Sequence, residues 1–123
     1  MKRRRLIIEP KSAILEYITT SSNQNIKLFY NQEKMNSKIK YCEDADTNTV
    51  IETYNYTFAN QGTHRIKIKL INVSDYSNLF NGCTNLISVD GTMFDNIIEV
   101  TDFSNTFSGC TRLTSIPSGL FDS

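Results

Sequence analysis

The chain has 123 residues, which is enough for one ordinary domain or for two very small ones. Its 13 lysine and arginine residues balance 13 aspartate and glutamate residues, so no overall positive charge draws the protein to nucleic acid or to an anionic membrane. The apolar runs are far shorter than the roughly 18 residues that a membrane-spanning helix needs. Composition therefore predicts neither nucleic-acid binding nor membrane insertion.

The chain opens with a basic segment, residues 2–5, of sequence KRRR. A secretory signal requires an apolar stretch of about 7 to 15 residues after such charges, but the apolar residues 6–8 are followed at once by Glu9 and Pro10. We therefore expect no export signal in this sequence. A solvated arm is the favoured interpretation of the basic residues, and docking on an acidic partner is the alternative.

Six short apolar runs predict β-strands, since none shows a helical period over ten or more residues. Apolar and polar residues alternate most clearly in residues 54–58 and 66–70, as in half-buried strands. Asn60 and Gly62 lie between these two runs and are typical of a tight hairpin turn. The six runs are residues 6–8, 13–18, 26–30, 39–41, 50–58 and 66–71, and residues 19–25 and 44–48 are polar connectors.

These strands predict that residues 1–72 form a small antiparallel β-sandwich with a basic N-terminal arm. Arg65, Lys67 and Lys69 alternate along its last strand. With Glu52 expected on the neighbouring strand, they are interpreted as a solvated sheet surface and not as a nucleic-acid site.

Few residues of this unit could carry chemistry. His64 is the only histidine in the chain, and no nucleophile motif surrounds it, so a surface or hairpin role is favoured over catalysis. Glu43, Asp44 and Asp46 could offer oxygen ligands to Ca²⁺, but their spacing matches no calcium loop. We therefore expect a protein without catalytic residues, metal ions or cofactors.

The second unit, residues 73–123, contains one segment written twice. The first copy, residues 75–95 (DYSNLFNGCTNLISVDGTMFD), aligns with the second copy, residues 102–122 (DFSNTFSGCTRLTSIPSGLFD), at an offset of 27 residues. A period in the twenties with apolar residues at fixed positions is typical of a solenoid, in which each coil buries its apolar side against the next. Each copy is expected to start with a short helical or 3₁₀ turn, in which the aspartate (Asp75, Asp102) or the serine (Ser77, Ser104) can cap exposed backbone N–H groups.

Apolar residues at equivalent positions of the two copies are predicted to point inward. They are Val73/Val100, Tyr76/Phe103, Phe80/Phe107, Cys83/Cys110, Leu86/Leu113, Val89/Ile116, Met93/Leu120 and Phe94/Phe121. A short strand beginning at Leu86 is expected to pair with its equivalent at Leu113. The positions that differ most should face outward, because packing does not dictate their identity: Asn81/Ser108, Asn85/Arg112, Ile87/Thr114 and Asp90/Pro117.

The three cysteines, Cys42, Cys83 and Cys110, cannot all pair with one another. Cys83 and Cys110 occupy the same repeat position, so they should lie on successive coils about 4.8 Å apart. Free cysteine behaves as a small apolar residue. Two reduced, buried side chains are therefore favoured over a disulfide or a metal site.

The spacing of apolar residues in the repeat follows a known pattern. Phe107 is followed three residues later by Cys110, and then by Leu113 and Ile116, and the first copy matches at the equivalent positions. In this the repeat resembles the BspA-type leucine-rich repeats of bacterial surface proteins. Arrays of that unit occur in surface proteins of gut and oral bacteria, in some protists and in predicted tail or fibre proteins of phages. The resemblance implies adhesion or recognition and not catalysis.

Residues 56–68 (YTFANQGTHRIKI) contain a tyrosine, a short loop with glycine and a final alternating strand. In this they resemble the PKD-type β-sandwich, a module that often precedes such repeats. Residues 40–46 (KYCEDAD) stand where that family has a tryptophan and a Gly-Asp-Gly turn, both missing here, so no carbohydrate or ion site is carried over. The two resemblances together imply a mainly β protein, a PKD/Ig-like sandwich followed by a solenoid of about two 27-residue coils.

These features predict a non-catalytic recognition, adhesion or scaffold module of a bacterial surface or phage-associated protein. Its partner would be a protein or a glycan, bound through Asn85, Ile87, Arg112 and Thr114 on the solenoid surface. The alternative is a structural virion component, such as a phage fibre, tail or head-associated protein, which uses the open repeat edge and the basic N-terminus as assembly contacts.

The expected location is the cell surface, the extracellular space or a virion. About three coils are normally needed for a stable solenoid, and the sequence contains about two. We therefore expect the chain to be part of a longer chain or of a larger assembly.

Overall fold

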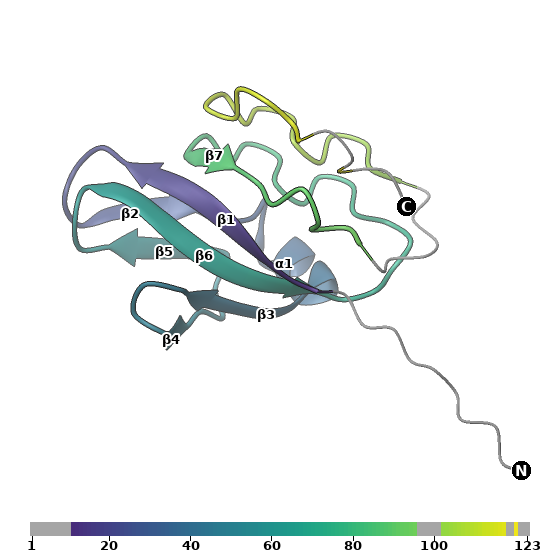
Figure 1. The fold of residues 1–123 in the computed structure, drawn as a ribbon, viewed down its shortest axis with the longest axis horizontal. Helices are drawn as coiled ribbons and strands as arrows, with labels where there is room; N and C mark the ends of the chain where they lie inside the picture. The colour runs from purple at the N-terminus through teal and green to yellow at the C-terminus, as the bar shows by residue number, and fades with distance from the viewer. Residues whose placement is uncertain (1–10, 96–101, 118–119, 121–123) are drawn as a thin grey trace, which may run out of the picture.

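The computed structural model describes residues 11–95, 102–117 and 120 (Figure 1). In these residues the protein is mainly β, with antiparallel sheets and one short helix, which confirms the predicted class at that level. The expected strand at residues 6–8 lies outside the described residues. The elements are β1 (Ser12–Thr19), β2 (Gln24–Lys27), α1 (Gln32–Lys38), β3 (Ile39–Asp44), β4 (Thr49–Val50), β5 (Asn55–Phe58), β6 (Gly62–Leu70) and β7 (Leu86–Ser88).

Two sheets make an arrangement consistent with a β-sandwich. The larger sheet has the strand order β4-β3-β6-β1-β7, and the smaller pairs β2 with β5. The central pair, β1 and β6, is antiparallel along its whole length, from Ser12 opposite Lys69 to Thr19 opposite Gly62. These two long strands form the middle of the larger sheet (Figure 1).

The two-residue alternation of β1 and β6 explains which side chains enter the core. Every second residue is buried in β1 from Ala13 and in β6 from Ile66, and the residues between them are half-buried. The hydroxyl of the fully buried Tyr17 donates to the carbonyl oxygen of Leu28 at 2.6 Å, which ties β1 to the segment after β2. The buried apolar residues of the pair are Ala13, Leu15, Tyr17, Ile66, Ile68 and Leu70.

The predicted hairpin between residues 54–58 and 66–70 is wrong. β5 pairs with β2 in the smaller sheet, whereas β6 pairs with β1 and β3 in the larger one. The turn at Asn60 and Gly62 therefore crosses between sheets. Thr19 holds this crossing, because its hydroxyl donates to the Asn60 carbonyl at 3.1 Å and accepts from the Gly62 N–H at 3.2 Å.

Helix α1 has no counterpart among the sequence-based expectations, because seven residues are too few to show a helical period. Asn31 caps it, and its side-chain oxygen accepts the N–H of Lys34 at 2.8 Å. Met35 is the buried residue of this helix. A polar segment thus becomes helical through one cap and one apolar anchor.

The two predicted units share one sheet and one core in the described part of the chain. β7, which belongs to the second unit, pairs antiparallel with β1, and the Ser88 hydroxyl donates to the Glu16 carboxylate at 2.7 Å. The expected pairing between Leu86 and Leu113 strands is therefore wrong: β7 adds to the sandwich, and residues 113–117 form no strand. A single apolar cluster joins residues of both units.

Candidate interaction surface

The two copies of the repeat lie side by side with their backbones in the same direction (Figure 1). Asp75 and Asp102 form a parallel bridge at the start of the contact. Four N–H groups of the first copy then donate to carbonyl oxygens of the second over 2.8 to 3.0 Å. The donors are Tyr76, Asn78, Phe80 and Gly82, and the acceptors are Asp102, Ser104, Thr106 and Ser108.

Each copy enters this contact through the same turn. The carboxylate of Asp75 accepts the N–H of Ser77 at 2.7 Å, and that of Asp102 accepts the N–H of Ser104 at 2.8 Å, as the predicted capping role requires. Hydrogen bonds from the serines hold the pKa of both carboxyl groups below the usual range. The turn is therefore anchored by an ionised aspartate.

Both copies next pass through the left-handed backbone region at an asparagine and a glycine. Asn78 and Asn105 have φ of 62° and 57°, and asparagine tolerates this conformation better than most residues. Gly82 and Gly109 have φ of 77° and 73°. A Cβ on Gly109 would lie 3.3 Å from the Gly82 backbone, so glycine also permits the close approach of the two copies.

Side chains at equivalent positions meet across the contact. The rings of Phe80 and Phe107 stack in parallel, with centroids 5.5 Å apart and planes 4° apart. The Cys110 thiol donates to the Phe80 carbonyl at 3.1 Å. The Thr106 hydroxyl shares its one proton between the Tyr76 carbonyl at 3.0 Å and the Phe103 carbonyl of its own copy at 2.7 Å. The sequence-based expectation that Phe80 and Phe107 lie against each other is confirmed.

The residues predicted to bind a partner do not share one environment. Arg112 and Thr114 are exposed, and Ile87 is half-buried; the Arg112 guanidinium donates to the Thr84 carbonyl at 3.3 Å. The prediction that Asn85 faces outward is wrong, because only 9% of it is exposed. Of the other positions expected to face outward, Ser108 is exposed, and Asn81, Asp90 and Pro117 are half-buried.

Asn85 is buried because it joins the first copy to the sandwich. Its side-chain amide donates to the Ile18 carbonyl at 2.8 Å, and its backbone carbonyl accepts the Ile18 N–H at 2.8 Å. The second copy has no equivalent neighbour in the described residues, which explains why arginine replaces asparagine at position 112. A difference between copies can thus mark a contact that only one copy makes, as well as a solvated position.

The far side of the second copy is less covered than that of the first. We call Phe103, Phe107, Leu113 and Ile116 the terminal face. The first three are half-buried, and Ile116 is 41% exposed. Their equivalents in the first copy, Tyr76, Phe80, Leu86 and Val89, are all buried.

The three cysteines are unpaired and buried, which confirms the expected burial of Cys83 and Cys110. Burial raises the pKa of all three thiols, and that of Cys42 reaches about 12. Because the thiolate is the nucleophile and the metal ligand, these side chains act as small core residues at neutral pH.

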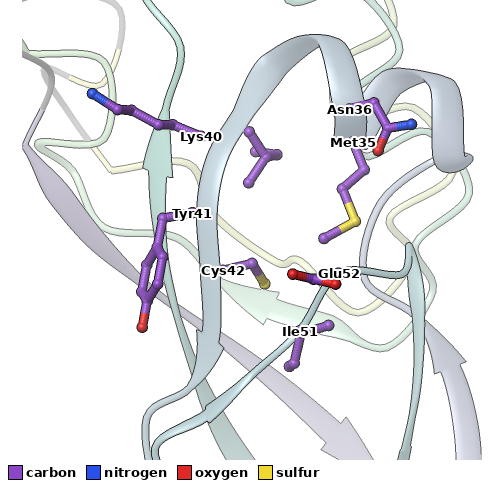
Figure 2. Close-up of a pocket in the computed structure, with 8 residues that line it drawn as sticks. Met35, Asn36, Lys40, Tyr41, Cys42, Ile51 and Glu52 are labelled. Atoms are coloured by element: carbon purple, nitrogen blue, oxygen red, sulfur yellow. The ribbon is translucent and has the colours of Figure 1, made fainter.

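A cavity of about 400 Å³ lies between α1, β3 and the residues after β4. Figure 2 shows Met35, Cys42 and Ile51 on one side of β3, with Tyr41 on the other. Strand alternation separates Tyr41 from Cys42. The irregular register at Lys40, where Ile39 and Tyr41 lie opposite the consecutive residues Leu70 and Lys69, lets Ile39 be buried on the same side as Cys42. The lining residues are Met35, Asn36, Ile39, Lys40, Tyr41, Cys42, Ile51 and Glu52.

The charged groups of the outer sheet face pair with one another. Arg65 contacts Asp46, with Nε and Oδ1 3.1 Å apart, and Lys67 lies 3.9 Å from Glu43. Glu52 was expected to balance the charge of these basic residues. The acidic partners are instead Glu43 of β3 and Asp46 of the turn after it. Among the described residues, no group of three or more His, Cys, Asp or Glu side chains is placed to hold a metal ion.

His64 has a structural environment. Its ring stacks on Phe58, with centroids 4.0 Å apart, and its Nε2 lies 2.8 Å from the Thr19 hydroxyl. Since this is the only histidine in the chain, any nucleophile activated by a histidine would have to lie next to His64.

The described helices include none that is long and apolar enough to cross a membrane.

No family model, curated protein or solved structure matches the chain.

Proposed function

We propose that this chain is a non-catalytic recognition, adhesion or scaffold module, made of a PKD-like β-sandwich and a short leucine-rich solenoid of the BspA type. It binds a protein or a glycan through the surface of the repeats. The resemblance of the repeat to bacterial surface and phage proteins supports a location at a cell surface, in the extracellular space or on a virion.

The observation that carries this proposal is the in-register contact between the two copies. Equivalent turns hold the two copies in register, so the exposed positions that differ between copies lie on a regularly spaced support. Solenoids bind partners through such surfaces. Arg112 and Thr114 are the exposed positions that this proposal assigns to the partner.

The absence of a catalytic role is supported by the state of the reactive groups. The cysteine thiols are buried with raised pKa values, and the histidine ring is packed on Phe58. A nucleophile needs an adjacent base within hydrogen-bond reach. The hydroxyl within reach of His64, that of Thr19, is buried and donates to the Asn60 carbonyl, so it is not open to a substrate.

Binding to panels of immobilised glycans and extracellular-matrix proteins tests the proposal. We expect saturable binding that weakens by about tenfold in Thr114→Arg, a change of roughly 1.4 kcal/mol. The matched control is Thr63→Arg, the same substitution at an exposed position on β6. Equal affinity of the two variants, or the absence of saturable binding on either panel, would contradict the proposed role.

A structural virion component is the second candidate. The observation that favours it is the terminal face, since partly exposed apolar residues often mark assembly contacts. Light scattering across a range of concentrations distinguishes the two. An obligate oligomer of the native chain favours the virion component, and a monomer that binds a ligand favours the recognition module.

A further inference from the structure

The first copy of the repeat shows what covers this type of segment. Phe80 is fully buried and contacts two rings, Phe29 of the sandwich and Phe107 of the second copy, which stacks on it. The four backbone hydrogen bonds each join residues 26 apart, and the two side-chain hydrogen bonds each join residues 30 apart. The covering segment is therefore another copy of the same sequence, displaced by one repeat and running in the same direction.

The second copy repeats the groups that make this contact possible. The terminal face carries aromatic and aliphatic residues at the positions of Tyr76, Phe80, Leu86 and Val89. Asn105 and Gly109 also have the same left-handed backbone conformation as Asn78 and Gly82. Shape and apolar character are thus reproduced one repeat further along.

We propose that the terminal face binds a third segment with the same repeat pattern, stacked in parallel at the same offset. This inference rests on the repeat architecture in the proposed function and names the kind of partner that its far end takes. In the third segment, a cysteine thiol donates to the Phe107 carbonyl, as Cys110 donates to Phe80. A threonine hydroxyl donates to the Phe103 carbonyl, as Thr106 donates to Tyr76.

A second chain presenting its own terminal face is a poorer occupant. Two identical faces meet about a two-fold axis, which sets Phe107 against Phe107 and reverses one backbone. The hydrogen bonds between the observed copies join segments that run in the same direction, so two-fold packing does not reproduce them. A parallel copy reproduces both the hydrogen bonds and the ring stacking.

The test is an extended chain in which residues 96–122 are repeated once after Asp122, which preserves the 27-residue offset. Exchange of the backbone amides of residues 104–110 is measured in the native and extended chains. We expect exchange about tenfold slower or more in the extended chain, because protection follows the free energy of local opening. The midpoint of thermal unfolding should also rise.

The matched control carries serine at the three added positions that correspond to Phe107, Cys110 and Leu113. Equal amide protection in the extended chain and in this control would overturn the proposal. So would a native chain that dimerises at micromolar concentration and becomes monomeric with Ile116→Asp, because that result assigns the terminal face to a second chain.

A second variant keeps the test informative if the added copy folds poorly. Ile116→Asp should leave the unfolding midpoint of the native chain nearly unchanged and lower that of the extended chain. If the extended chain does not fold, a peptide of residues 96–122 added in excess to the native chain must slow the same amides, and failure to do so rejects the proposal. Neither measurement uses a glycan or a matrix protein, so its outcome is separate from the binding test of the proposed function.

Discussion

At the scale of single residues, equivalent positions of the repeat serve different purposes. Asn85 makes two hydrogen bonds with Ile18 and is buried. Arg112 occupies the same repeat position, is exposed and reaches the Thr84 carbonyl. The neighbour, and not the repeat position, decides whether a side chain joins the fold or faces a partner.

Asn85→Ala is therefore expected to destabilise the protein by about 1–3 kcal/mol, because the Ile18 carbonyl loses a donor in a buried contact. Urea unfolding of the purified variant measures this change. Arg112→Ala, the equivalent substitution in the second copy, should change the free energy of unfolding by less than about 0.5 kcal/mol. Similar losses in the two variants would show that Asn85 does not join the copies to the sandwich.

At the scale of elements, the turn that begins each copy is the unit that repeats. An aspartate cap, an asparagine and a glycine at positive φ recur in both copies. The glycine serves two purposes, since it adopts the left-handed conformation and lets the copies approach. The strand differs between the copies. In the first copy β7 pairs with β1, whereas residues 113–117 of the second copy form no strand.

Gly109→Ala should cost about 1–2 kcal/mol from the left-handed backbone alone, with a further loss because its Cβ would lie 3.3 Å from the Gly82 backbone. Ser108→Ala, one residue earlier and exposed, is the control. The midpoints of thermal unfolding of the two variants measure this loss of stability. A Gly109→Ala protein as stable as the control would mean that the copies are not held in this register.

Much of the element pattern could be predicted from the sequence, because alternation reports burial directly. β1 and β6 lie where apolar and polar residues alternate, and the aspartate turns lie at the start of each copy. Strand partners could not be predicted in the same way: a turn at Gly62 looks alike whether the chain returns to the same sheet or crosses to another. Asn85 was misassigned because its partner, Ile18, is 67 residues away.

At the scale of the whole molecule, several carboxylates stabilise the fold in their ionised form. Hydrogen bonds from the serines lower the pKa of Asp75 and Asp102, and the N–H of Arg65 lowers that of Asp46. A carboxyl whose pKa is lower in the folded state stabilises it at pH values above its unfolded pKa, which is about 3.9 for aspartate. That contribution is lost as the pH falls through the folded-state pKa.

We therefore expect the unfolding midpoint to fall as the pH is lowered from about 5 towards 2. In a variant carrying Asp75→Asn and Asp102→Asn, an amide oxygen still accepts the serine N–H but does not titrate, so this fall should be smaller. The control is Glu52→Gln, which removes one carboxyl at an exposed position and leaves both turns intact. Identical profiles for all three proteins would rule out a role for the ionised turns.

The position of β1 between β6 and β7 has a consequence for the order of folding. An array of identical units can nucleate anywhere along its length. Here, however, the strand of the first copy, β7, pairs with β1 of the sandwich. The repeats should accordingly fold in one direction, beginning with the first copy at β1 and continuing to the second copy. Since the pairing joins residues as far apart as Glu16 and Ser88, we expect this step to be slow and the second copy to be the last to acquire protection during refolding.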